Sequence, residues 1–183
     1  MIRKTHLLYN QILINMKKYL FVAMAAFLMV FAACKGKAKE EKIENVKIPE
    51  TFVTYENDNF SVQYPGDMKV TWSTGFLNAR TDDTEGQFDA SFSDMAPAVS
   101  ELKKYSENLA YMYKNMGETC EDPKVKDKVM TMRTTNGEYT RDAFIVLDGN
   151  GNAVSGSLQY TQNKAEEYKN YIAPIVASVK FKN

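Results

Sequence analysis

The stretch FSVQYP at residues 60–65 decides the fold. Its apolar residues alternate with polar ones, and this period of two predicts a β-strand that buries one face. Turn-forming sequences enclose the strand, with NDN at 57–59 and PGD at 65–67. The stretch before the first turn, residues 51–55, is rich in aromatic and β-branched residues and predicts another strand. The folded region therefore begins with two strands joined by a turn.

Strand patterns continue along the chain. Phe88, Ala90 and Phe92 alternate with polar residues, which predicts a half-buried strand. Further strands are expected at residues 68–72, 76–80, 125–134, 138–147, 153–161 and 179–181. The sequences TNG at 135–137 and DGNGN at 148–152 are typical of hairpin loops, so the last three long strands are expected to be joined in sequence.

Two helices are expected between the strands. The first begins near Pro97, which suits a first helical turn, and ends at Gly117. Its predicted buried stripe is Val99, Leu102, Ser106, Leu109, Tyr113 and Met116. The second begins with Asn163 as N-cap and Glu166 three residues later, as in a capping box, and Pro174 is expected to kink or end it. Its predicted buried face is Ala165, Tyr168, Ile172 and Ile175.

The order of these elements resembles the PsbP-like family, whose fold is shared by the Mog-type Ran-binding proteins. The motifs that carry the resemblance are FSVQYP at 60–65, the later Trp72, and IV at 175–176 followed by SVKF at 178–181. The resemblance covers residues 51–183. It implies an α+β fold with helices packed on a central antiparallel sheet, an α/β/α sandwich. It also implies a non-catalytic assembly or binding protein, and it transfers no partner-contacting residue.

The N-terminal sequence predicts a lipoprotein signal at residues 1–33. Two lysines precede an uncharged apolar stretch at 19–33, as in a secretory signal. The sequence FAAC at 31–34 resembles the bacterial lipobox, which implies cleavage before Cys34 and a diacylglyceryl group on its sulfur. Stable anchoring then takes two or three acyl chains. Met16 is a better start for this signal than Met1, and an uncleaved N-terminal anchor is the alternative interpretation.

Residues 34–50 are expected to form a flexible tether between the lipid and a single domain at 51–183. Eight of the 13 residues at 35–47 are charged, and such a stretch buries too little apolar surface to fold. The full chain has 23 basic and 23 acidic residues. Processing at Cys34 removes four basic residues and leaves a net charge of −4. This balance excludes the basic surface that nucleic-acid binding requires.

The sequence predicts no catalytic residue, cofactor or metal site. His6 is the only histidine and lies in the signal, so the processed chain has no Ser-His-Asp or Cys-His system. Cys120 is the only other thiol, and the acidic residues at 118, 121 and 122 disfavour its thiolate. We therefore interpret Cys120 as a passive, partly buried residue.

Asp148, Asn150 and Asn152 copy the first three ligand positions of a calcium loop. Ala153 stands where that loop needs glycine, and Gln159 stands where it needs a bidentate glutamate. We interpret the segment as a hairpin loop without a cation.

Two other groups of residues were candidates for binding. Asp82, Asp83 and Glu85 are interpreted as a solvated acidic loop. Among the tyrosines, Tyr113 and Tyr168 are expected in the core, and Tyr111 and Tyr171 are expected at the surface, where exposed aromatic rings can form a binding patch.

The leading functional hypothesis is a lipid-anchored cell-envelope protein, at the outer membrane, that binds another envelope protein and is not an enzyme. A lipoprotein that holds a small ligand or substrate in a cleft between sheet and helix is the alternative. A hydrolase that uses carboxylates alone is a third. A flat exposed aromatic patch would favour the first, an apolar pocket with converging polar groups the second, and paired carboxylates the third.

Overall fold

The computed structural model describes residues 46–182 of the chain. The predicted signal at 1–33, Met16, Cys34 and the tether up to residue 45 lie outside the described residues. Among residues 46–182, no helix is long and apolar enough to cross a membrane.

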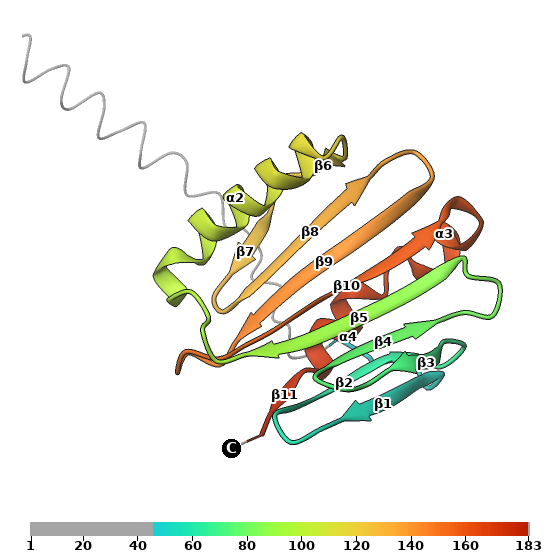
Figure 1. Ribbon diagram of the computed structural model, residues 1–183, viewed down its shortest axis with the longest axis horizontal. Coiled ribbons are helices and arrows are strands. Elements are labelled where there is room, and N and C mark those ends of the chain that lie inside the picture. Colours follow the sequence, from blue (N-terminus) through green and yellow to red (C-terminus); the bar gives the residue numbers. More distant parts are fainter. Residues whose placement is uncertain (1–45, 183) are drawn as a thin grey trace, which may run out of the picture. The chain divides into compact units, whose positions relative to one another are not determined.

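An eight-stranded antiparallel sheet forms the centre of the fold (Figure 1). Its strand order is β3-β4-β5-β10-β9-β8-β6, and β7 also pairs with β8. The strands are β3 (Lys69–Trp72), β4 (Phe76–Arg80), β5 (Gly86–Ser93), β6 (Thr119–Cys120), β7 (Lys124–Lys126), β8 (Val129–Thr135), β9 (Tyr139–Leu147) and β10 (Ala153–Thr161). The hairpins expected between β8, β9 and β10 are confirmed.

A small sheet, four short helical segments and one long helix complete the fold. The small antiparallel sheet has the order β1-β2-β11 and consists of β1 (Phe52–Glu56), β2 (Phe60–Pro65) and β11 (Lys180–Phe181). The helical segments are η2 (Val99–Glu101), η3 (Gln162–Lys164), α3 (Ala165–Tyr168) and α4 (Ile172–Ser178), and the one long helix described is α2 (Leu102–Asn115). The predicted α+β class, a large antiparallel sheet with helices packed on it, is confirmed.

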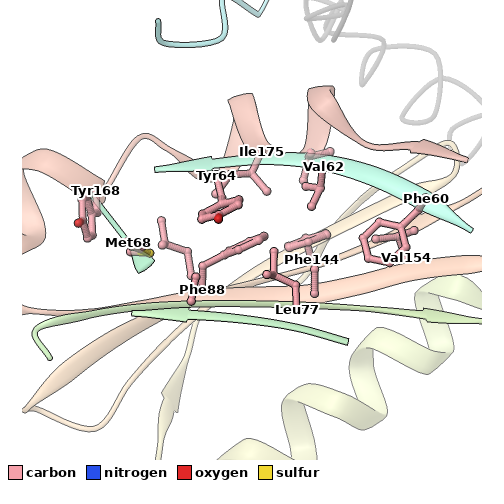
Figure 2. Close-up of a cluster of buried hydrophobic side chains, with 14 of the residues drawn as sticks. Phe60, Val62, Tyr64, Met68, Leu77, Phe88, Phe144, Val154, Tyr168 and Ile175 are labelled. Atoms are coloured by element: carbon pink, nitrogen blue, oxygen red, sulfur yellow. The ribbon is translucent and has the colours of Figure 1, made fainter. Parts of the chain in front are cut away.

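The main hydrophobic core lies between the large sheet and the strand at 60–65. Figure 2 shows β2 on one side of the core and the strands of the large sheet on the other. The rings of Tyr64 and Phe88 stack with centroids 5.4 Å apart, and Phe88 and Phe144 stack at 6.3 Å. The alternation of FSVQYP thus works as predicted, because Phe60, Val62 and Tyr64 are all buried against the sheet.

Helix α2 lies on the opposite face of the large sheet, away from this core (Figure 2). Its buried residues are Leu102, Ser106 and Ala110, and they pack on Met130 and Ile145 in a second hydrophobic cluster. The predicted stripe is wrong at its two ends, because Val99 and Met116 are exposed. The helix ends before Gly117, whose φ of 88° favours glycine as predicted.

The expected strand at 125–134 is two strands, β7 and β8, that pair with each other as a hairpin. The chain reverses at Asp127, which has a φ of 51°. Aspartate tolerates this left-handed conformation better than most residues. Alternation along 125–134 did not reveal the turn, because apolar residues occur on both sides of it.

The expected capping box at the second helix is wrong. Asn163 lies inside η3, and its side-chain nitrogen donates to Glu85 Oε1 at 2.6 Å. The expected single helix is two, α3 and α4, and Pro174 lies in the first turn of α4, where a missing N–H costs little. Tyr168 and Ile175 are fully buried, as predicted.

Candidate functional site

The large sheet presents a polar surface on the side away from its main core, which we call the outward face. Strand registers place its side chains in rows that cross neighbouring strands. The first row contains Phe76, Ser91, Ser155 and Ile145; the second contains Asn78, Asp89, Ser157 and Ala143; the third contains Arg80, Gln87, Gln159 and Arg141. On β9, the first two rows end in the apolar residues Ile145 and Ala143, and the third row ends in Arg141.

Helix α2 covers only one part of the outward face. It runs beside β7 and β8, and the described helices leave β4, β5 and β10 uncovered on this side (Figure 1). The polar side chains there are half-buried or buried, and several contact one another, as Ser91 does with Ser155 and Asp89 with Ser157. A surface that faces solvent and yet buries polar groups is unusual, since exposed strand residues ordinarily extend into water.

Asp89 is at the centre of this surface. Its carboxylate accepts a 2.6 Å hydrogen bond from the Ser157 hydroxyl. Burial raises the pKa of Asp89 above its usual value, although the hydrogen bond from Ser157 and the positive charge of Arg141 act in the opposite direction. A carboxyl group with a raised pKa is a frequent property of functional sites.

Arg141 is the last residue of the third row and lies next to Tyr113 of α2. Its guanidinium donates to Glu118 Oε1 at 2.8 Å and to Gln159 Oε1 at 3.0 Å, and it lies 5.1 Å from the centre of the Tyr113 ring. The Thr134 hydroxyl donates to the other oxygen of Glu118. These contacts fix the arginine in place and pair its charge, so the outward face carries little free positive charge at this end.

Aromatic and apolar side chains border the outward face on two sides. On the β3–β4 side, Trp72 and Phe76 stack with ring centroids 6.4 Å apart and are 55% and 42% exposed. A register shift between Val70 and Trp72 leaves Trp72 opposite Asn78, in the second row.

On the α2 side, the border is the flank formed by Tyr105, Met112 and Met116, all exposed. Positions seven and four residues apart lie on one side of a helix. The Cys120 thiol on β6 lies 3.6 Å from the carbonyl oxygen of Ala110, which is at the edge of the buried stripe farther from this flank, so that side of α2 faces β6. The Tyr105 flank therefore faces β9 and β10.

A second hollow lies on the core side of the sheet, between α4 and the β7–β8 hairpin. Its polar part has a volume of about 270 Å³ and contains Arg133, Asp142 and Lys169, and its apolar part has a volume of about 190 Å³ and is lined by Val129, Ile172 and Val176 among others. Four shared lining residues join the two parts. This is the cleft between sheet and helix that the alternative hypothesis requires.

Two of the charged groups in this cleft, Arg133 and Asp142, belong to a hydrogen-bonded network. Arg133 donates to both oxygens of Asp142, at 2.7 and 2.9 Å, and to the carbonyl of Lys169 at 2.7 Å. The Tyr160 hydroxyl donates to Asp142 at 3.0 Å. The pKa of Tyr160 is raised by burial first and by the charge of Asp142 second. The network explains how the sheet accommodates the buried Asp142, since a buried charge needs a partner.

The calcium-like sequence forms a hydrogen-bonded hairpin loop. Asp148 Oδ1 accepts from the backbone N–H of Asn150 and Asn152, and Oδ2 accepts from the Asn152 side chain at 2.6 Å. The Lys128 ammonium bonds the Asp148 carbonyl at 2.6 Å. Residues 46–182 contain no cluster of three metal-ligating side chains. The Asp148 carboxylate is therefore engaged within the turn itself.

The remaining predicted residues are not brought together. Cys120 is half-buried, and burial raises the pKa of its thiol. In the acidic loop, Asp82 forms an exposed ion pair with Lys69, and Asp83 accepts bonds from Thr81 and Glu85. Tyr111 is 68% exposed as predicted, whereas the prediction for Tyr171 is wrong. Its ring packs on Phe52, with centroids 5.1 Å apart.

Asp89, Ser157 and Arg141 were not among the residues singled out by sequence reasoning. The alternation at 88–92 places Asp89 on the polar face, so that part of the signal was present. Ser157 is 68 positions away in the sequence. Only the register between β5 and β10 brings the two side chains together.

No family model matches the chain, and no curated protein matches it. Solved structures with a distantly similar fold include the following two. Cyanobacterial PsbP (CyanoP) from Synechocystis sp. PCC 6803 is 12% identical, with a TM-score of 0.49, and the match covers 75% of this chain and 96% of that one. The Ran-binding protein Mog1p of Saccharomyces cerevisiae is 9% identical, with a TM-score of 0.48 and coverage of 73% and 96%.

Proposed function

We propose that this chain is a lipid-anchored cell-envelope protein that acts as a non-catalytic protein-binding or assembly module. The observation that carries the proposal is the exposed flank of α2, with Tyr105, Met112 and Met116 on one side of the helix. Methionine adapts its shape to a partner, and tyrosine and methionine are both enriched at protein interfaces. An exposed flank of this composition is typical of a docking surface.

The anchor in this proposal is a lipid on Cys34. The lipobox-like sequence at 31–34 and the charged stretch at 35–47 support it, since together they provide an attachment point and a tether. A Cys34→Ser variant should remain unprocessed or leave the membrane fraction. If that variant were processed to the same mass and still sedimented with membranes, the lipoprotein assignment would be wrong.

The protein-binding part is tested by crosslinking tagged protein in intact envelopes and identifying captured proteins by mass spectrometry. One dominant partner is expected with the wild-type protein. A Tyr105→Ala/Met112→Ala variant should lose most of that partner, since truncating central interface residues typically costs 2 kcal/mol or more, about 30-fold in affinity. Tyr111→Ala is the matched control, because Tyr111 is an exposed tyrosine of the same helix that lies about 120° around the axis from Tyr105. Equal capture by both variants would contradict the proposal.

The cleft between α4 and the β7–β8 hairpin favours a second candidate function, the binding of a small ligand. Its apolar part adjoins the polar part that contains Arg133, an arrangement typical of ligand pockets. An Ala173→Phe variant would fill the apolar part. A compound that raises the melting temperature of the wild-type protein and not of this variant would support the candidate, and compounds that act equally on both would not.

A further inference from the structure

We propose that the outward face of β4, β5 and β10 is a binding site for a neutral glycan, which lies across the strands from the Trp72–Phe76 pair toward Gln87 and Gln159. This inference goes beyond the proposed function, because it concerns another surface and another class of ligand. It is carried by three observations: the chemistry of the polar rows, the exposed aromatic pair at one end, and a hollow lined by amide and carboxylate side chains at the other.

The polar rows carry groups that suit sugar hydroxyls. The side chains of Asn78, Gln87, Gln159, Ser91 and Ser155 are amides and hydroxyls, which both donate and accept hydrogen bonds as sugar hydroxyls do. Neighbouring strands are about 4.8 Å apart, close to the length of one pyranose unit in an extended chain. A glycan that crosses the strands would therefore meet a new pair of polar side chains at nearly every sugar.

The aromatic pair provides the contact that polar groups cannot. One face of a pyranose ring consists of C–H groups, and these pack on the faces of aromatic rings. Trp72 and Phe76 are stacked, substantially exposed and placed opposite Asn78 and Ser91 in the first two rows. The exposed aromatic rings thus lie next to side chains that form hydrogen bonds. A sugar can use both kinds of contact, whereas a purely apolar ligand can use only the rings.

The hollow at the other end has a volume of about 260 Å³ and is lined by Gln87, Gln159 and Thr161, among others. The carboxylates of Glu85 and Glu138 line the same hollow. The two glutamine amides can donate and accept hydrogen bonds and the carboxylates can accept them, so the hollow suits a ligand that carries hydroxyl groups.

The charges of the surface favour a neutral glycan over an anionic one. Asp89 is central in the second row and would repel an acidic sugar or a phosphate when ionised. Arg141, the cation at the α2 end, is already paired with Glu118. Arg80 alone projects a cation from the exposed side of the rows. A nucleic acid or an acidic glycan would need several unpaired cations here.

The sole tryptophan of the chain makes the test direct. Trp72 is part of the site, so its fluorescence reports binding without a label. The full chain is held in a detergent without a sugar headgroup and titrated separately with chitohexaose, cellohexaose and maltohexaose, three neutral hexasaccharides. A heparin hexasaccharide serves as the anionic arm. At least one neutral hexasaccharide is expected to give a saturable change, and heparin none.

Matched variants locate the binding. Phe76→Ala and Gln87→Ala should each weaken it several-fold, up to about tenfold, as expected for the loss of one stacking or hydrogen-bonding contact. Tyr111→Ala should bind as the wild type does.

Circular dichroism and melting temperature verify that the variants fold. Because the two variants are on different strands, the test still works if one of them does not fold. The proposal is overturned if no neutral hexasaccharide binds in the millimolar range, if only heparin binds, or if both variants bind normally. The test uses no partner protein, so its outcome is independent of the proposed protein-binding function.

Discussion

The two faces of the large sheet are built from the same strands and differ in almost every physical property. On the core face, Phe88, Phe144 and Leu158 are fully buried beneath β2 and α4. On the outward face, the adjacent residues Asp89 and Ser157 hydrogen-bond to each other in a polar surface that α2 covers only in part. Successive residues of a strand point to opposite faces, so one alternating sequence encodes both.

The difference between the two faces indicates which residues stabilise the fold and which are available for binding. The core face holds β4, β5, β9 and β10 in place by close packing against β2 and α4. The outward face contributes little apolar burial over β4, β5 and β10, yet it retains the half-buried carboxyl group of Asp89 and an unpaired hydroxyl. Natural proteins retain such unfavourable features at functional sites. Substitutions on the two faces are therefore expected to change the free energy of unfolding by different amounts and, in one case, with opposite sign.

The largest effect is expected on the core face, from Phe88→Ala. The ring stacks on Tyr64 and on Phe144, and its removal leaves a cavity in the main core. Such truncations cost about 3–5 kcal/mol in the free energy of unfolding. Urea denaturation measures the loss. A loss below about 1 kcal/mol would mean that the core face does not determine stability as described.

An intermediate effect is expected from Asp142→Ala, in the charged network on the core face. The change leaves the Arg133 guanidinium without its carboxylate partner and the Tyr160 hydroxyl without its acceptor. Breaking a buried ion pair costs about 3–5 kcal/mol. Because the Arg133 side chain is 35% exposed, we expect a smaller loss of about 2 kcal/mol. Denaturation by urea at neutral pH measures it, and an unchanged midpoint would show that the network contributes nothing.

Asp89→Asn should have the opposite sign at neutral pH. The raised pKa means that the folded state binds the Asp89 proton more tightly than the unfolded state, so stability falls as the pH rises through the folded-state pKa. Asparagine cannot ionise and can still accept the Ser157 hydrogen bond. The variant should gain about 1 kcal/mol at pH 7, a typical gain at a functional site, and no advantage below the usual aspartate pKa. Melting temperatures of both proteins from pH 3 to 8 test this, and a destabilised variant at pH 7 would contradict it.

The smallest effect is expected from Ser155→Ala, on the outward face. The Ser155 hydroxyl lies 3.4 Å from that of Ser91, at the limit of hydrogen-bonding distance. Surface substitutions of this kind usually change stability by less than about 0.5 kcal/mol. A larger loss in urea denaturation would show that the outward face is needed for folding.

Most of the fold could be predicted because alternation and turn residues act locally. The strand at 153–161 was predicted with the bounds that β10 has, because the Gly- and Asx-rich loop at 148–152 precedes it and the expected N-cap Asn163 follows it. The turn at Asp127 was missed because one residue with positive φ leaves no pattern. The sequence predicts one helix after residue 164 where the structure has α3 and α4, because the apolar spacing continues across the break at 169–171.

The candidate sites were far less predictable. Alternation placed Asp89 on a polar face but could not supply its neighbours, which come from β4 and β10 through strand registers. The Arg133–Asp142 pair likewise depends on the register between β8 and β9. A site composed across strands of distant sequence is visible only when the sheet is assembled.

The central claim is that the outward face and its α2 border form a binding surface. The most direct measurement is site-specific photo-crosslinking in intact envelopes, with a photoreactive phenylalanine analogue at position 105 or, separately, at position 111. Both positions are exposed tyrosines of α2, and only the first borders the outward face. The account predicts a discrete crosslinked species from position 105 and none from position 111. No crosslinked species from position 105, or the same species from both positions, would contradict it.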